Sequence, residues 1–318
     1  MGARRGRSIV AFVASLAITT GASALAQART TAGSRKTGPH EYSCPIFPQN
    51  NPLNQEIAHA SVDPNSAAYI ASIGLSGHLH PDFGTNPSYG IPYVVVGPHQ
   101  PKVPIKFTEY GEESNPGPYP IPADAQVERA GEEGDRHVLV LQEGSCKLYE
   151  LYNAQRASTG WEAGSGAVFD LRSNALRPNG WTSADAAGLP IFPLLVRYPE
   201  VHAGQIDHAL RVTVARTQAG FIHPATHFAS SSTDPALPPM GLRLRLKASY
   251  SLAGFHGESL VVLRALKRYG LIVADNGSSW YITGAPDPRW NDEDLEQIKL
   301  VPGSAFEAVQ TGSILRTG

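Results

Sequence analysis

Residues 242–250 read Leu-Arg-Leu-Arg-Leu-Lys-Ala-Ser-Tyr, so apolar and polar side chains alternate along the stretch. Successive side chains of a β-strand point to opposite faces of its sheet, and this pattern therefore predicts a half-buried strand. Residues 206–215 alternate in the same way. Two long alternating stretches, each with one apolar face, indicate a protein built mainly from β-sheets.

Shorter strand signals surround these two stretches. Apolar or alternating runs occupy residues 93–96, 103–107, 137–141, 147–152, 166–170, 271–274 and 280–282. Helical spacing is limited to residues 63–73, 258–269 and 291–298. We therefore expect an all-β protein with a few peripheral helices, folded as an antiparallel β-sandwich of jelly-roll type. A distorted barrel is the alternative.

The composition fits a folded chain that is rich in turns. Of the 318 residues, 42% are hydrophobic and 17% are charged, which provides a sizeable core and too little charge for a disordered protein. The 31 glycines and 26 prolines exceed average usage. A net charge of -2 without a basic stripe argues against a nucleic-acid-binding protein.

The N-terminus has the features of an export signal. Arg4, Arg5 and Arg7 precede an apolar run over residues 9–18, and Ala24-Leu25-Ala26 is a signal-peptidase motif. The apolar run is too short for a permanent membrane anchor. We expect a secreted protein, periplasmic or extracellular, that leaves by the ordinary secretory route or by the twin-arginine route.

Three segments follow from this interpretation. Residues 1–26 are the signal peptide, residues 27–40 are a disordered lead, and residues 41–312 form a single β-sandwich domain. The exported chain then begins near Gln27 and carries no membrane anchor. Its oligomeric state is not indicated by any pattern.

The two cysteines agree with export. Cys44 and Cys146 are the only cysteines in the chain, and exported proteins reach an oxidising compartment. We therefore expect a disulfide between them rather than two free thiols.

The common catalytic motifs are missing from the sequence. It contains no G-x-S-x-G nucleophile elbow, no H-E-x-x-H zinc motif, no P-loop and no dinucleotide-binding glycine motif. The most easily recognised hydrolases, metalloproteases and nucleotide-binding proteins are thereby excluded.

Four histidines raise the possibility of a metal site. His78 and His80 would project to one face of an extended chain, as two ligands of one metal would. His223 and His227 lie in a predicted loop that could join them. The alternative is that these are surface or hydrogen-bonded histidines and that the protein has no cofactor. His80 and Asp82 are also further candidates for catalytic residues.

Acid–base residues also occur at the ends and faces of predicted strands. Asp135 and His137 stand at the entry to an apolar strand, where they are candidates for proton transfer. The alternative is a capped turn with His137 hydrogen-bonded inside. His208 is a further catalytic candidate, although its phase places it on the apolar side of its strand. Arg211 lies on the opposite face, as a candidate substrate-binding residue.

A basic row is predicted on the second face of residues 242–250. If Leu242 and its apolar partners face the core, then Arg243, Arg245 and Lys247 face outward together. Such a row can bind the carboxylates of an acidic polysaccharide, and neutralisation of a uronate followed by proton abstraction is the chemistry of a polysaccharide lyase. The alternative is a solvated edge strand protected by basic residues.

Two stretches carry a resemblance to other proteins. Residues 163–189, with Trp181-Thr182-Ser183-Ala184-Asp185-Ala186-Ala187-Gly188, and residues 273–278, Val-Ala-Asp-Asn-Gly-Ser, resemble a group of secreted bacterial proteins. The resemblance covers about residues 44–309. It implies no activity and supplies no catalytic residues.

These observations predict a secreted enzyme that acts on an extracellular polysaccharide as a lyase or a glycoside hydrolase. A non-catalytic glycan-binding protein is the first alternative, because Trp161, Trp181, Trp280 and Trp290 have polar neighbours and aromatic rings stack on sugars. A metal enzyme that uses the four histidines is the second. The arrangement of the titratable side chains distinguishes these classes.

Overall fold

The alternating stretch at residues 242–250 forms part of a central sheet, but only its first half is a strand. In the computed structural model, which describes residues 1–2, 39–131 and 134–317, strand β12 spans Arg243–Leu246. Residues 3–26 of the predicted signal peptide and residues 27–38 of the predicted lead lie outside the described residues. His40, the last residue of that lead, begins a short hairpin made of β1 (His40–Glu41) and β2 (Cys44–Pro45).

Six strands of the described chain form the largest sheet, in the order β15-β12-β13-β11-β14-β3. They are β3 (His80–Asp82), β11 (Leu210–Val214), β12, β13 (Leu271–Asn276), β14 (Tyr281–Thr283) and β15 (Phe306–Val309). The pairs β11–β13 and β14–β3 are parallel, and the other three pairs are antiparallel. The sheet is therefore mixed.

The two faces of this sheet differ in polarity. Its strand register places Leu244, Leu271 and their apolar neighbours on one face, in the main core. The opposite face carries charged side chains, among them Arg211 and Asp275. Because the second face is also covered by other parts of the chain, its charges are buried and need partners within the protein.

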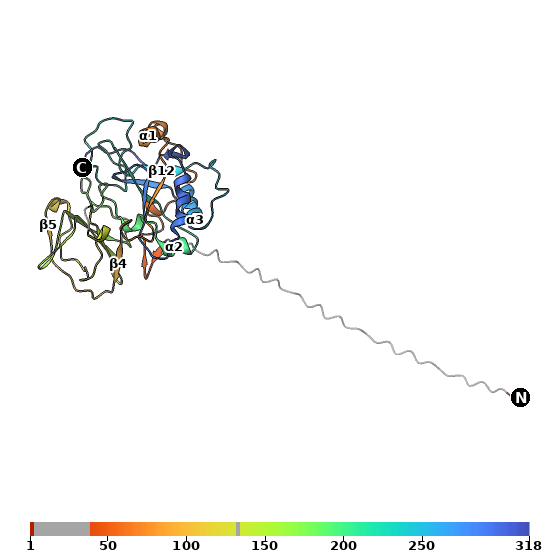
Figure 1. Ribbon diagram of the computed structural model, residues 1–318, viewed down its shortest axis with the longest axis horizontal. Coiled ribbons are helices and arrows are strands. Elements are labelled where there is room, and N and C mark those ends of the chain that lie inside the picture. Colours follow the sequence, from red (N-terminus) through yellow and green to blue (C-terminus); the bar gives the residue numbers. More distant parts are fainter. Residues whose placement is uncertain (3–38, 132–133, 318) are drawn as a thin grey trace, which may run out of the picture. The chain divides into compact units, whose positions relative to one another are not determined.

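A second sheet has the order β10-β7-β6-β4 and separates two hydrophobic cores. Its strands are β4 (Tyr93–Val96), β6 (Val138–Gln142), β7 (Lys147–Tyr152) and β10 (Ser165–Asp170). Leu139 and Leu141 enter the main core, whereas Val138 and Val140 enter a smaller core. The small core is closed by a third sheet of β5 (Ile105–Phe107), β9 (Gly160–Ala163) and β8 (Gln155–Ala157). In Figure 1, β4 and β5 lie together at one end, away from α1 and α3.

The helices lie around the central sheet. They are α1 (Ser66–Ile73), α2 (Tyr198–His202), α3 (Gly257–Arg268) and α4 (Asp292–Leu295), with 3-10 turns η1 (Pro52–Asn54), η2 (Gly111–Glu113), η3 (Glu128–Gly131), η4 (Phe192–Leu194), η5 (Glu296–Leu300) and η6 (Gly303–Ala305). Helix α3 contacts β12 (Figure 1). Gly270 follows this helix at φ 69°, a conformation that favours glycine. Among the described helices, none is both long and apolar enough to cross a membrane.

The structure confirms a β-rich fold with few helices. The jelly-roll arrangement is not confirmed, because four of the eleven pairings between described strands are parallel. Of the predicted helices, 258–269 corresponds closely to α3, whereas 63–73 begins three residues later than expected, at Ser66. The segment 291–298 divides into α4 and η5.

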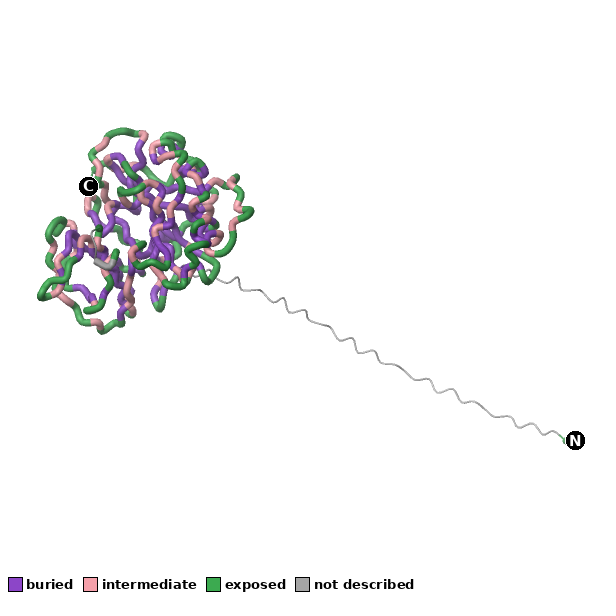
Figure 2. The backbone as a smooth tube through the Cα atoms, viewed as in Figure 1, coloured by how far each residue is buried: buried purple, intermediate pink, exposed green. Residues whose placement is uncertain are grey.

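The predicted disulfide is confirmed. Cys44 in β2 is bonded to Cys146, which lies in the turn between β6 and β7, and both residues are fully buried. The bond therefore ties the N-terminal hairpin to the second sheet. Figure 2 shows the buried segments running through the interior of the molecule.

Replacing both Cys44 and Cys146 by alanine should lower the free energy of unfolding. The bond closes a loop with a sequence separation of 102 residues, for which the chain-entropy model gives up to ~4.7 kcal/mol. Denaturant unfolding of the wild-type and variant proteins measures the loss. A variant whose stability equals that of the oxidised wild-type protein would contradict the expected structural role.

Candidate functional site

A buried ion pair lies on the polar face of the central sheet. The Arg211 guanidinium of β11 donates to both carboxylate oxygens of Asp185, from Nε to Oδ2 at 3.1 Å and from Nη2 to Oδ1 at 2.7 Å. Its Nη1 donates to Thr283 Oγ1 of β14 at 2.6 Å. The Asp185 side chain is 0% exposed and that of Arg211 is 5% exposed. Arg211 thus serves this pair and does not face an open surface as predicted.

A tight turn holds Asp185 in place. Ser183 Oγ accepts a hydrogen bond from the Asp185 backbone N–H at 2.9 Å and donates to the Leu189 carbonyl at 2.6 Å. Gly188 closes the turn at φ 71°, where a Cβ atom would collide with Thr226 Oγ1. The backbone of this turn therefore favours glycine at position 188 and uses the hydroxyl of Ser183 as a hydrogen-bonding group.

Asp275 at the end of β13 forms the second carboxyl of the site. Its Oδ2 lies 3.8 Å from Arg211 Nη2, and its side chain is 21% exposed. Burial, the negative charge of Asp185 and a hydrogen bond to Asp185 raise the pKa of Asp275 well above its usual range, against the opposing effect of Arg211. Asp275 therefore keeps its proton at a pH where an ordinary aspartate has lost it.

A small polar cavity of about 170 Å³ opens beside Asp185 and Asp275. Its lining includes both carboxyls and several groups able to form hydrogen bonds: Asp135, Tyr152, Thr182, Asp185, His227, Asp275 and Asn276. Asp135 is exposed and comes from the loop that leads into β6. Asp135, one of the predicted catalytic residues, thus lines the cavity.

His227 is fixed in one orientation at the cavity. Its Nδ1 lies 2.7 Å from the Ala186 carbonyl oxygen. Because a carbonyl oxygen only accepts, Nδ1 carries a hydrogen and donates it. In the neutral ring, Nε2 is then left as an acceptor for a substrate hydroxyl.

His137 lies near the cavity but inside the protein. Its Nδ1 is 2.7 Å from Glu128 Oε2 and its Nε2 is 2.9 Å from the Ala184 carbonyl. Burial alone would lower its pKa, but the Glu128 carboxylate overrides this and raises the pKa to about 9. His137 is therefore an internal imidazolium that supports the Asp185 turn, which corresponds to the hydrogen-bonded alternative in the sequence analysis.

Glu150 is the other buried acid near this site. Its Oε1 accepts hydrogen bonds from the backbone N–H groups of Ile191 and Phe192, both at 2.9 Å. Burial raises the pKa of Glu150 to about 7, although these two bonds oppose the shift.

The structure places His208 in a separate buried cluster. Its Nε2 is 3.1 Å from Glu200 Oε2 and 3.0 Å from Arg197 Nη2. The His208 side chain is 0% exposed, so it lines no surface cavity, and its predicted place on the apolar side of its strand agrees with this burial.

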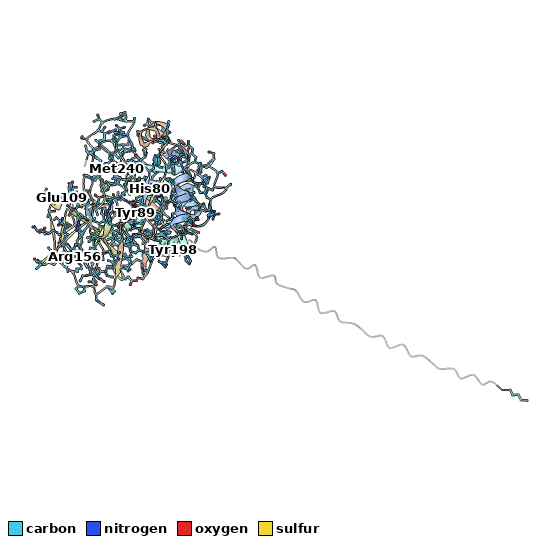
Figure 3. All side chains as sticks on the ribbon, in the orientation of Figure 1. His80, Tyr89, Glu109, Arg156, Tyr198 and Met240 are labelled. Atoms are coloured by element: carbon cyan, nitrogen blue, oxygen red, sulfur yellow. A yellow bond between two sulfur atoms is a disulfide. The ribbon has the colours of Figure 1, made fainter. Side chains whose placement is uncertain are left out.

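His80 and Asp82 lie in strand β3, where Asp82 pairs with Thr283, whose hydroxyl accepts a hydrogen bond from Arg211. His80 lines a cavity of about 400 Å³ together with Tyr89, and both residues are labelled in Figure 3. The His80 ring stacks on that of Tyr281, with 4.1 Å between the ring centroids. Burial lowers the pKa of His80 and raises that of Asp82. Neither residue lines the cavity beside Asp275.

The predicted basic row is not an open face. Arg243 and Arg245 are 2% and 7% exposed, and they bind backbone carbonyls of segment 52–60, with Glu307 as an additional partner of Arg245 at 2.6 Å. Lys247 is half-buried and donates to the Ser304 carbonyl at 2.8 Å. The prediction of a substrate-binding row is wrong, because the face opposite the apolar one is covered by the N-terminal segment.

The four histidines of the proposed metal site do not come together. Within the described ranges, no group of three or more His, Cys, Asp or Glu side chains is placed to hold a metal ion. His223 instead contacts Asn179 Oδ1 at 2.8 Å, and His78 is exposed next to a bridge with Pro302.

Asp185 and Asp275 were not among the predicted catalytic residues. Asp185 lies in the stretch 163–189 and Asp275 in the stretch 273–278, and the fold brings these two stretches together. Comparisons with models of protein families, with curated proteins and with solved structures find no match to this chain. The function of the site therefore has to be inferred from its geometry and chemistry.

Replacing Arg211 by methionine should destabilise the protein by about 3–5 kcal/mol, because Asp185 would remain buried without its cation. Arg268→Met is the matched control. Arg268 pairs with Glu56 at 2.6 Å, but both side chains are substantially exposed, so a loss of at most about 1 kcal/mol is expected. Equal losses in the two variants, measured by denaturant unfolding, would contradict the role assigned to Arg211.

Glu150 should make the protein less stable as pH rises. A folded pKa of about 7 against a usual value of 4.5 means that its contribution is complete below pH 4.5 and is lost as pH rises through 7. The difference corresponds to about 3 kcal/mol. Glu150→Gln keeps Oε1 as the acceptor of both backbone bonds but cannot ionise, so its unfolding free energy should fall less between pH 5 and pH 7.5. Parallel pH profiles for the two proteins would refute this assignment.

Proposed function

We propose that the protein is an exported hydrolase of polysaccharides and that Asp275 is its general acid. The single observation that carries the proposal is the gathering of three carboxyls in the lining of one polar cavity: Asp275 beside the buried Asp185–Arg211 pair, and the exposed Asp135. Glycoside hydrolases generally use one carboxylic acid with a raised pKa and a second carboxylate.

The reaction would proceed by proton transfer at both ends of the bond. Asp275 donates its proton to the glycosidic oxygen as the bond from that oxygen to the anomeric carbon breaks. Asp135 accepts a proton from the water whose oxygen bonds to the same carbon. Asp185, held by Arg211, accepts the hydrogen bond of Asp275 and positions its carboxyl. His227 and Asn276 offer hydrogen-bonding groups for the hydroxyls of the substrate.

Hydrolysis is better supported than the other reactions considered. Lyase action on acidic polymers would need free cations at the cavity, whereas Arg211, Arg243 and Arg245 are buried in internal contacts. A glycan-binding protein without catalysis would need a row of exposed aromatic side chains. Trp161, Trp280 and Trp290 are buried, and of the four tryptophans only Trp181 is partly accessible.

Export and an extracellular substrate remain part of the proposal. The sequence of residues 1–26 and the disulfide between Cys44 and Cys146 support them. The small polar cavity supports a substrate with many hydroxyl groups, of which one unit enters at a time.

Asp275→Asn should reduce kcat on a cleaved polysaccharide by on the order of 100- to 10,000-fold, because an amide cannot supply the proton. In the wild-type protein, activity should be high below the pKa of Asp275 and fall as pH rises through it. The residual activity of Asp275→Asn should lack this alkaline limb. Release of reducing ends from neutral, amino-sugar and uronic-acid polymers measures the reaction.

Asp124→Asn, a change at an exposed carboxyl outside the cavity, is the control and should retain full activity. An unsaturated, ultraviolet-absorbing product would indicate a lyase instead. Full activity of Asp275→Asn, or no cleavage of any polymer by the wild-type protein, would overturn the proposal.

A further inference from the structure

Next to the cavity of Asp275 lies a second cavity, of about 240 Å³, which is distinct from the cavity that His80 lines. Trp181 is partly buried in its lining, and Phe169, Arg177 and Asn115 also contribute to it. The Arg177 guanidinium lies 5.6 Å from the centre of the Trp181 ring and 5.7 Å from that of Phe169. The cavity therefore combines aromatic surface with polar groups.

The two cavities share one wall. Arg177 donates to the Thr182 carbonyl at 3.0 Å and to the Glu113 carbonyl at 2.6 Å, and the Thr182 N–H donates to Glu113 Oε2 at 2.8 Å. Thr182 lines the cavity of Asp275, whereas its neighbour Trp181 lines the second cavity. Hydrogen bonds among Arg177, Thr182 and Glu113 therefore connect the lining of one cavity to the lining of the other.

The opposite segment shows the same division. Tyr110 lines the cavity of Asp275, and Asn115 lines the second cavity, with the short helix η2 between them. Both segments that separate the cavities therefore contribute side chains to each of them.

We propose that the second cavity is a subsite that binds the adjoining sugar units of the chain cleaved at Asp275. This inference rests on the proposed function. A cavity of about 170 Å³ is smaller than the roughly 300–1,000 Å³ of pockets that enclose a whole ligand, so a polymer has to extend beyond it. An aromatic face with hydrogen-bonding neighbours is the chemistry that stacks on a sugar ring and binds its hydroxyls.

The chain-length dependence of cleavage tests the subsite. Cello-, xylo- and chito-oligosaccharides from disaccharide to hexasaccharide are compared in the wild-type protein and in Trp181→Ala. In the wild-type protein, kcat/KM should rise with length. Trp181→Ala should lower kcat/KM about 2- to 10-fold on the long substrates, through KM, and leave the disaccharide unaffected. Trp181→Phe keeps an aromatic ring and should restore most of the loss.

Tyr89→Ala is the matched control, since it removes an exposed aromatic side chain from the cavity near His80. It should change neither substrate series. If cleavage occurs but Trp181→Ala acts equally on short and long substrates, or on none, the subsite is refuted and the hydrolase proposal stands.

Binding separates this inference from the reaction itself. Calorimetric titration of Asp275→Asn with the same oligosaccharides should show affinity that increases with length and decreases about 2- to 10-fold when Trp181→Ala is added. Length-dependent binding by a wild-type protein that cleaves nothing would support the subsite and overturn the hydrolase. Absence of binding by every oligosaccharide would overturn both.

Discussion

The buried ion pair between Arg211 and Asp185 is the constraint on which this structure depends. A charge removed from water is tolerated only when a partner and further hydrogen bonds satisfy it, and Arg211 uses three nitrogens for this purpose. The same guanidinium ties β11 to β14 and to the turn around Asp185, and it approaches Asp275 at 3.8 Å. Loss of this pair would therefore affect the sheet and the cavity together.

The ion pair explains why a carboxyl with a raised pKa occurs beside it. Asp185 pairs with Arg211 through both of its carboxylate oxygens. The negative charge of Asp185 nevertheless acts on the neighbouring carboxyl of Asp275. Burial and that charge favour the protonated form of Asp275, and the edge of the cavity leaves part of its side chain accessible. One fully buried acid and one partly exposed acid thus acquire different roles from their surroundings.

The alternation of apolar and polar residues predicts the strands and the side chains that share a face, but it does not predict which segment covers that face. Alternation placed Arg243 and Arg245 together correctly, since side-chain direction in a strand has a period of two. It could not show that segment 52–60, almost two hundred residues earlier in the chain, supplies the carbonyl oxygens that bind them. Asp135 was recognised as a candidate because it precedes an apolar strand, and the fold places it at the cavity. Asp185 and Asp275 lie in two distinctive stretches, but the pattern of those stretches predicts no catalytic role for either residue.

The β-rich class, the few helices and the disulfide can be predicted from the chain alone, because each depends on local periodicity or on the presence of just two cysteines. The mixed sheets, the burial of His137 and His208, and the guanidinium shared by two acids ninety residues apart cannot be predicted in this way. Strand order, burial and pKa depend on contacts between distant segments. Such contacts leave no periodic trace in the segments that make them.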